Sequence, residues 1–255
     1  MCGRFAVTTD PARLAEQLDA VDETGVDFAP NYNIAPTTAI AAVIATPGDA
    51  HEDAPSEERR IRLMRWGLLP AWVKADSAGK PVQKAQLINA RAETVTTSPA
   101  YRSAAEHKRC LIPMDGYYEW KRPAGDPLTG SPKRGGKTPY FFFRPDHRPL
   151  LVAGLWSVWR PARDASGLLT CTVITTDAVG AFADVHDRMP LVLGEDDWDR
   201  WLDPQCPAPR DLLAAPPDVA GMAMREVSTL VNRVANNGPE LLEALEPTMT
   251  PRNEA

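Results

Sequence analysis

Short apolar segments of strand length recur along this chain, and they restrict its fold more than any other sequence feature. Helical patterns are few, and strands and helices do not alternate in the regular order of βαβ units. The sequence therefore predicts an α+β fold that is mainly β, a single domain with a barrel-like sheet core and a few short helices. The expected strands span residues 2–7, 38–45, 61–66, 109–114, 116–120, 140–143, 150–159, 169–176 and 222–228.

The remaining segments are predicted as helices and loops. Asp10 followed by Pro11 predicts the start of a helix that runs to about Leu18, because Asp caps helices and Pro suits their first turn. We expect segments 109–114 and 116–120 to pair with each other as adjacent strands. Further helices are expected at 98–107, just before 184, and at 195–202; loops are expected at 31–37, 47–59, 76–82 and 184–190, and a Gly- and Pro-rich hairpin insertion at 121–138.

The chain has 255 residues and is 44% hydrophobic, enough for one large core. We predict one domain over residues 1–255, which includes the acidic C-terminal part, 191–255. We also expect the protein to be a monomer. No apolar run is long enough to span a membrane, and the N-terminus does not look like a signal peptide. The four cysteines are scattered without a C-x-x-C pair, which favours a reducing cytoplasm over disulfides or a zinc ribbon.

The net charge of −6 is unevenly distributed, and this matters for a polyanionic partner. Segment 195–255 holds 12 acidic and 5 basic residues, whereas segment 102–137 holds 8 basic and 4 acidic residues. The acidity therefore lies in the C-terminal quarter and leaves room for a basic cleft elsewhere. Two solvated surfaces of differing charge would explain the same distribution.

Cys2 directly follows the initiator Met1. Enzymes that trim Met accept small second residues, so Cys2 can become the N-terminus and carry a free amine beside its thiol. Such a 1,2-aminothiol condenses with an aldehyde to an imine and then closes a thiazolidine ring. Unperturbed pKa values of about 7.7–8.0 for the amine and about 8.5 for the thiol leave both groups usable near neutral pH. Alternatively, Cys2 is only the residue that follows the start codon.

Imine chemistry at Cys2 needs helper groups, and three polar residues are candidates. Asn89 can hold a substrate hydroxyl without changing the local charge, although it would also suit a turn. Glu119 lies in an aromatic strand segment, where burial would raise its pKa and let it carry protons; the alternative is an edge residue facing water. His186, between Asp184 and Asp187, could titrate near neutrality, but a lone His is often structural.

Six blocks of residues follow one another along residues 2–190. They are Met1-Cys2-Gly3-Arg4-Phe5, Asn31-Tyr32-Asn33-Ile34-Ala35-Pro36-Thr37, Arg65-Trp66-Gly67-Leu68-Leu69-Pro70, Asn89-Ala90-Arg91-Ala92-Glu93-Thr94, Gly116-Tyr117-Tyr118-Glu119-Trp120 and His186-Asp187-Arg188-Met189-Pro190. In content and order these blocks resemble the SOS-response-associated peptidase (SRAP) family, the abasic-site processing proteins. The tail beyond Pro190 carries no motif of this kind.

The resemblance implies a β-rich domain that binds single-stranded DNA and crosslinks to abasic sites, with lyase and self-processing chemistry and no metal or organic cofactor. It implies that Cys2 is the nucleophile, supported by Asn89, Glu119 and His186. It also implies DNA contacts by five further residues, among them an aromatic near the lesion that could equally be a core residue. These are Arg4, Arg91, Arg188 and Thr175 at phosphates, and Trp66 as a stacking or wedge aromatic.

Two rival functions remain open from the sequence. In the first, Cys2 attacks a peptide carbonyl as an N-terminal-nucleophile peptidase, with its own amine as base. In the second, the protein reads damaged DNA without a covalent step and Cys2 is inert. A covalent adduct, a cleaved peptide, or unmodified protein that still binds DNA would separate the three functions.

Overall fold

The computed structural model describes residues 2–47, 57–83, 85–123 and 136–245, and most of them lie in strands. One group of strands comprises β1 (Arg4–Val7), β3 (Asn31–Ile34), β8 (Gly116–Lys121), β9 (Thr138–Phe143) and β13 (Ala223–Glu226). The other comprises β2 (Ala20–Asp22), β4 (Ala39–Pro47), β5 (Glu57–Trp66), β6 (Asn89–Arg91), β7 (Arg109–Met114), β10 (Leu150–Trp159), β11 (Leu168–Asp177) and β12 (Arg188–Pro190).

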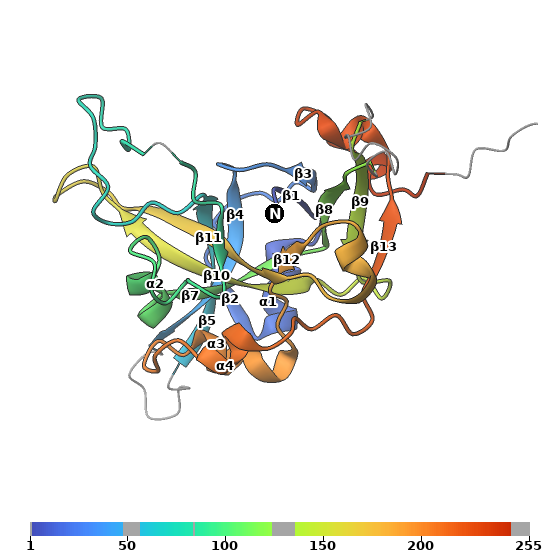
Figure 1. Cartoon of the computed structure of the whole chain (residues 1–255). Coiled ribbons are helices and arrows are strands. Elements are labelled where there is room, and N and C mark those ends of the chain that lie inside the picture. The colour runs from blue at the N-terminus through green and yellow to red at the C-terminus, as the bar shows by residue number, and fades with distance from the viewer. Residues whose placement is uncertain (1, 48–56, 84, 124–135, 246–255) are drawn as a thin grey trace, which may run out of the picture.

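These strands form two sheets (Figure 1). The five-stranded sheet has the order β13-β9-β8-β1-β3, and the eight-stranded sheet has the order β12-β11-β10-β7-β4-β5-β2, with β6 beside β11. The predicted mainly β α+β fold is confirmed. In the described part of the chain, none of the helices has the length and apolar character needed to cross a membrane.

Short helices pack against the eight-stranded sheet. The α-helices are α1 (Pro11–Leu18), α2 (Arg102–His107), α3 (Trp198–Leu202) and α4 (Arg210–Ala214); single 3₁₀ turns lie at Gly180–Asp184, Glu195–Asp197, Thr229–Asn232 and Pro239–Leu241. In the view of Figure 1, α3 and α4 lie below this sheet and α2 lies at the left. The predicted start of α1 is confirmed, because the Asp10 side chain accepts a hydrogen bond from the Ala12 amide. The second helix begins at Arg102 rather than at 98.

The predicted pairing of segments 109–114 and 116–120 is wrong. Strand β7 pairs with β10 and β4, whereas β8 pairs with β1 and β9. Only Asp115 separates them, and its amide donates to the carbonyl of Ala6 at 2.9 Å. The chain therefore crosses from one sheet to the other at this residue. By contrast, the predicted hairpin is confirmed, since Lys121 lies opposite Thr138; residues 124–135 lie outside the described part.

Loop predictions were too generous at three places. Strand β3 lies inside the expected loop 31–37, because Ile34 pairs with Phe5 of β1. Strand β4 continues to Pro47 and β5 begins at Glu57, so the expected loop 47–59 shrinks to the undescribed residues 48–56. Strands β2, β6 and β12 and helix α4 were not predicted; β12 lies in a segment, 184–190, that was expected to be a loop.

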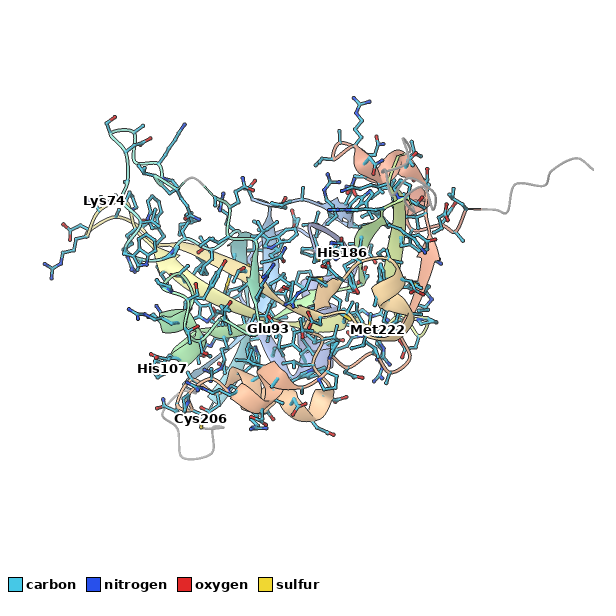
Figure 2. The ribbon with its side chains drawn as sticks, in the orientation of Figure 1. Lys74, Glu93, His107, His186, Cys206 and Met222 are labelled. Carbon is cyan, nitrogen blue, oxygen red and sulfur yellow. The ribbon has the colours of Figure 1, made fainter. Side chains whose placement is uncertain are left out.

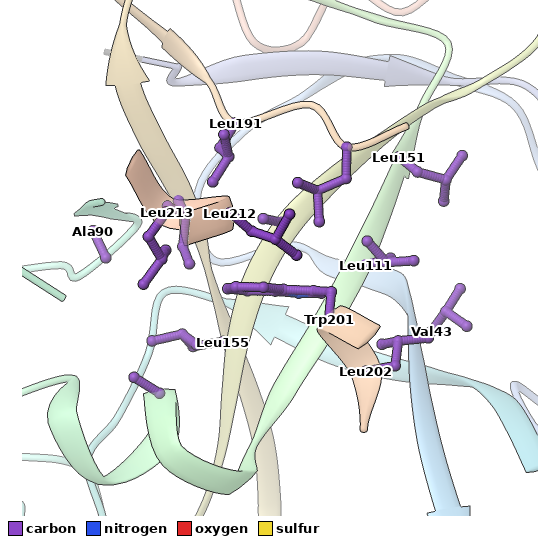
Figure 3. Close-up of a cluster of buried hydrophobic side chains, with 14 of the residues drawn as sticks. Val43, Ala90, Leu111, Leu151, Leu155, Leu191, Trp201, Leu202, Leu212 and Leu213 are labelled. Carbon is purple, nitrogen blue, oxygen red and sulfur yellow. The ribbon is translucent and has the colours of Figure 1, made fainter. Parts of the chain in front are cut away.

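A buried tryptophan and a buried arginine anchor the helices to the large sheet. Trp201 lies at the centre of a hydrophobic cluster (Figure 3), and its Nε1 donates to the carbonyl of Cys110 in β7 at 2.9 Å. Arg109 is buried, and its guanidinium donates to backbone carbonyls of two segments at once. The acceptors are Ala105 and Glu106 in α2, and Trp201, Asp203 and Cys206 in and after α3.

Candidate active site

The N-terminal end of β1 lies where residues of the two sheets meet (Figure 1). In the five-stranded sheet β1 pairs with β8, so that Arg4 faces Tyr118. From the eight-stranded sheet, Asn89 at the start of β6 donates a hydrogen bond from Nδ2 to the Cys2 carbonyl oxygen at 2.7 Å. Both sheets therefore fix the backbone of Cys2.

The thiol of Cys2 is fully buried. Burial raises the pKa of this thiol above its ordinary value, and the charge of Glu119 raises it further; the N-terminal amine and the Arg4 backbone act in the opposite direction. Sγ lies 4.0 Å from the Arg4 carbonyl oxygen, a weak contact. The resting thiol is thus protonated at neutral pH, and thiolate chemistry here requires a base and a stabilising donor.

Glu119 lies on β8 and is 4% exposed. Gly116 allows this strand to lie close to β9, because a Cβ there would be 2.3 Å from the carbonyl oxygen of Phe142. The acid faces His186, whose Nε2 lies 3.9 Å from Glu119 Oε2. His186 follows the 3₁₀ turn at Gly180–Asp184, and Figure 2 shows it on the same side of the molecule as β8 and β12. The buried acid and the half-buried imidazole form a pair, and the acid acts electrostatically on Cys2.

The other ring nitrogen of His186 has two partners that demand different protonation states. The Arg188 amide donates to Nδ1 at 3.0 Å, which suits a neutral ring with its proton on Nε2, toward Glu119. Asp187 Oδ1 lies 2.9 Å from the same Nδ1 and suits a protonated ring. The Arg188 amide and Asp187 thus hold the imidazole ring in place from its Nδ1 side, while Nε2 points toward Glu119.

The predicted phosphate contacts differ widely in accessibility. Arg91 at the end of β6 is exposed. Arg4 is half-buried, and its Nη1 donates to Asn33 Oδ1 at 2.8 Å and to the Val231 carbonyl at 2.9 Å. Thr175 is fully buried, and its hydroxyl lies 3.4 Å from the Ala90 carbonyl. The predicted phosphate contact by Thr175 is therefore wrong.

Arg188 is mostly buried and held by carboxylates. Its guanidinium makes a bidentate pair with Glu93 at 2.6 and 3.0 Å, a second ion pair with Asp177 at 2.6 Å, and a bond to the Thr175 carbonyl at 2.7 Å. These contacts join β12 to β11 and to Glu93, two residues after the end of β6. The charge of Arg188 is thus compensated within the protein, which favours a structural role over a phosphate contact.

Trp66 is a core residue, and the prediction that it stacks on DNA bases is wrong. Its ring is fully buried, meets Phe5 edge-on at a centroid distance of 5.0 Å, and donates from Nε1 to the Ile88 carbonyl at 2.9 Å. The exposed aromatic near this motif is Trp72, which is 68% exposed. A bridge between Leu68 and Leu87 holds the loop after β5 beside the segment that leads to Asn89.

All of the site residues lie within one match to a known protein family. The family model described as SOS response associated peptidase (SRAP) matches residues 1–234. Abasic site processing protein YoaM of Bacillus subtilis (strain 168) is 37% identical, over 96% of this chain and 98% of the relative. Abasic site processing protein HMCES of Gallus gallus is 31% identical, over 96% of this chain and 78% of the relative.

Solved structures share the fold. A Bacteroides thetaiotaomicron protein is 20% identical and superposes with a TM-score of 0.74, over 95% of this chain and 99% of its own. A Bordetella bronchiseptica protein is 26% identical with a TM-score of 0.68, over 89% of this chain and all of its own.

Proposed function

The chain belongs to the SOS response associated peptidase (SRAP) family, and we propose that it captures abasic sites in single-stranded DNA as a covalent crosslink through Cys2. The single observation that carries the proposal is the meeting of Cys2, Asn89 and the Glu119–His186 pair at one junction between sheets. The names of the relatives, abasic site processing proteins, agree with this chemistry.

The first step requires removal of Met1, which frees the Cys2 amine. An abasic sugar exists partly as a ring-opened aldehyde. The amine adds to its C1′, and the resulting carbinolamine loses water to give an imine. Glu119 and His186, 3.9 Å apart, supply and receive the protons that this addition and dehydration require.

The second step uses the thiol. The Sγ–H proton passes to the acid–base pair, a C–S bond forms at C1′, and the electron pair of the C=N bond moves to nitrogen, which takes up a proton. The product is a five-membered thiazolidine that joins protein and DNA. Asn89 supports both steps, because Nδ2 holds the Cys2 carbonyl while Oδ1 is buried without a hydrogen bond in the described structure and can accept one from a sugar hydroxyl.

The imine also opens a lyase route. Its electron demand acidifies the protons at C2′; a base removes one of them, and the 3′ phosphate leaves with the electron pair of the C3′–O bond. Closure of the thiazolidine removes the imine and so ends this route. The crosslink and the strand break are therefore competing outcomes of one intermediate.

We place three residues on the path of the single strand: the exposed Arg91 and Trp72, and the half-buried Arg4. Arg91 offers a phosphate contact without sequence reading, and Trp72 offers a ring on which an unstacked base can lie. Arg4 retains donors that are not used by Asn33 and Val231. Arg188, held by carboxylates, is left out of this DNA path.

Intact-mass spectrometry with two oligonucleotides tests the proposal. One carries a true abasic site, and the matched control carries a tetrahydrofuran analogue that cannot open to an aldehyde. We expect the protein without Met1 to gain the mass of the first oligonucleotide only, and Cys2→Ser to lose the stable adduct but still be trapped by borohydride. A cleaved peptide would favour the peptidase, and bound but unmodified protein would favour a non-covalent reader; either result refutes the crosslink.

A further inference from the structure

Tyr117 on β8 carries a buried hydroxyl that has no hydrogen-bond partner in the described part of the structure. The side chain is 1% exposed, and its ring stacks on Phe142 at a centroid distance of 4.7 Å and an interplanar angle of 7°. Phe at this position would keep the stack and spare the protein an unsatisfied polar group, which is unfavourable when buried. The hydroxyl therefore calls for a role outside packing.

The position of Tyr117 points to the site. It lies two residues before Glu119, so both side chains share one face of β8, and it shares a buried cluster with Cys2. Neighbouring Tyr118 belongs to a different cluster on the other face, where its hydroxyl donates to the Tyr32 carbonyl at 2.8 Å. The two tyrosines are thus equally buried, but only one has a partner.

The electrostatic environment agrees with this placement. Burial raises the pKa of Tyr117 well above its ordinary value, and the charges of Cys2 and then Glu119 raise it further. Both groups therefore lie within electrostatic range of the hydroxyl, which stays protonated at neutral pH. It is a permanent neutral donor beside a thiol whose ionisation both burial and Glu119 oppose.

We propose that the Tyr117 hydroxyl donates a hydrogen bond to the Cys2 sulfur as the thiol gives up its proton, and so speeds closure of the thiazolidine ring. The proposal rests on the crosslinking function above. The proton leaves Sγ for the acid–base pair, the sulfur lone pair forms the C–S bond, and the imine nitrogen takes up the electron pair of the C=N bond together with a proton. Tyr117 keeps its own proton throughout.

Other charged groups near the sulfur do not replace this donor. Glu119 is an acid that opposes the thiolate, and His186 approaches it from the loop before β12. Arg4 directs its guanidinium to Asn33 and Val231, in the surroundings of Tyr118. The freed Cys2 amine is consumed in the imine when the ring closes. Tyr140 also packs against this cluster, but its hydroxyl lies 3.4 Å from Glu226 Oε2, so Tyr117 is the hydroxyl donor among the fully buried members of the described cluster around Cys2.

The test compares Tyr117→Phe with the matched control Tyr118→Phe in single-turnover reactions with an abasic oligonucleotide. Borohydride trapping measures imine formation, and the borohydride-independent adduct measures ring closure. For Tyr117→Phe we expect the rate of imine formation to stay within twofold of wild type and ring closure to be slowed roughly 10- to 100-fold at pH 7. The increase of the ring-closure rate with pH should also begin at a higher pH than in wild type. Tyr118→Phe should close the ring at the wild-type rate.

Thermal unfolding separates this role from a structural one. Tyr117→Phe removes a hydroxyl without a partner and should keep or raise the Tm, whereas Tyr118→Phe loses a hydrogen bond and should lower it. Unchanged closure in Tyr117→Phe, equal slowing of imine and closure, or a Tm loss like that of Tyr118→Phe would each overturn the proposal.

A DNA-independent reaction separates failure of this proposal from failure of the crosslinking function. Formaldehyde converts an N-terminal cysteine to a thiazolidine, which is followed as a mass gain on the N-terminal peptide of the purified protein. If wild type forms this ring but no DNA adduct, the DNA function fails while Tyr117 is still tested by its effect on the ring. Equal rates in wild type and Tyr117→Phe, or no ring in wild type, overturn the role of Tyr117.

Discussion

Replacing Glu119 with Gln should have two opposite effects, and their separation is the sharpest test of the site. The acid is 4% exposed and lies 3.9 Å from His186 Nε2, so Gln preserves its shape but cannot carry a proton. Its charge also raises the pKa of the Cys2 thiol. We therefore expect Glu119→Gln to slow proton transfer in imine formation and, at the same time, to ease ionisation of the thiol.

The two effects differ in size. Loss of a positioned proton-transfer group typically costs roughly 10²–10⁴-fold in rate, so imine formation should fall by about 100-fold or more. The gain in thiol ionisation is smaller, because burial is the larger cause of the raised pKa of Cys2 and Gln does not change it. The rate of ring closure should therefore start to increase at a lower pH than in wild type, while the overall rate of stable adduct formation stays low. Binding of the oligonucleotide should remain near wild type.

The assay is single-turnover formation of the trapped imine and of the stable adduct between pH 5 and 9, beside equilibrium binding to the same oligonucleotide. Glu106→Gln, a change of an exposed acid on α2, is the matched control and should behave as wild type. Wild-type imine rates in Glu119→Gln across this range would refute proton transfer by Glu119. A closure profile that moves to higher pH would contradict its electrostatic coupling to Cys2.

Other changes test the DNA path and the fold. Trp72→Ala should weaken binding to an intact single strand by about 1–3 kcal/mol, measured by fluorescence anisotropy; equal affinity removes Trp72 from the path. Arg91→Ala should flatten the slope of log affinity against log salt by about 0.7, and an unchanged slope argues against a phosphate contact. The hydrogen bond from Arg188 lowers the pKa of Glu93, so their ion pair stabilises the fold fully above about pH 4.3, and this stabilisation is lost as pH falls through the lowered pKa. In urea unfolding, Glu93→Gln should reduce the loss of unfolding free energy on acidification by at most about 1 kcal/mol. Arg109→Met should lower the free energy of unfolding by at least about 3 kcal/mol in denaturant titrations, because it leaves several backbone carbonyls unsatisfied; a loss below about 1 kcal/mol would contradict its anchoring role.

Strand positions were largely predictable from the sequence because they depend on local patterns. Strand β10 matches its predicted bounds, and β11 differs by one residue at each end. Partner choice was not predictable, because it depends on contacts distant in sequence. Asp115 alone separates β7 from β8, a spacing that suggests adjacent strands, yet its amide bonds to Ala6 and the chain changes sheets there.

Residue types predicted candidate chemistry well and predicted accessibility poorly. The structure brings Cys2, Asn89, Glu119 and His186 together, although their roles remain proposals. A tryptophan in a short motif looks the same whether it faces solvent or the core, so Trp66 was placed on the DNA side of the site. Strand alternation could have indicated Tyr117, since residues at i and i+2 share a face and Glu119 was already a candidate.

The burial of Cys2 sets the order of the proposed chemistry. A free α-amine has an ordinary pKa of about 7.7–8.0, so a usable fraction is neutral at physiological pH. The thiol is protonated there, since burial and Glu119 both raise its pKa. The amine must therefore react first, and the thiol acts only when the imine carbon lies next to it. A protonated thiol in a closed cluster is also a poor target for oxidants, because oxidation requires both thiolate character and access. The same burial that makes Cys2 a weak nucleophile at rest would thus protect it from oxidation until an aldehyde arrives. Formation of the C–S bond would then depend on a hydrogen-bond donor that is already in place, the Tyr117 hydroxyl.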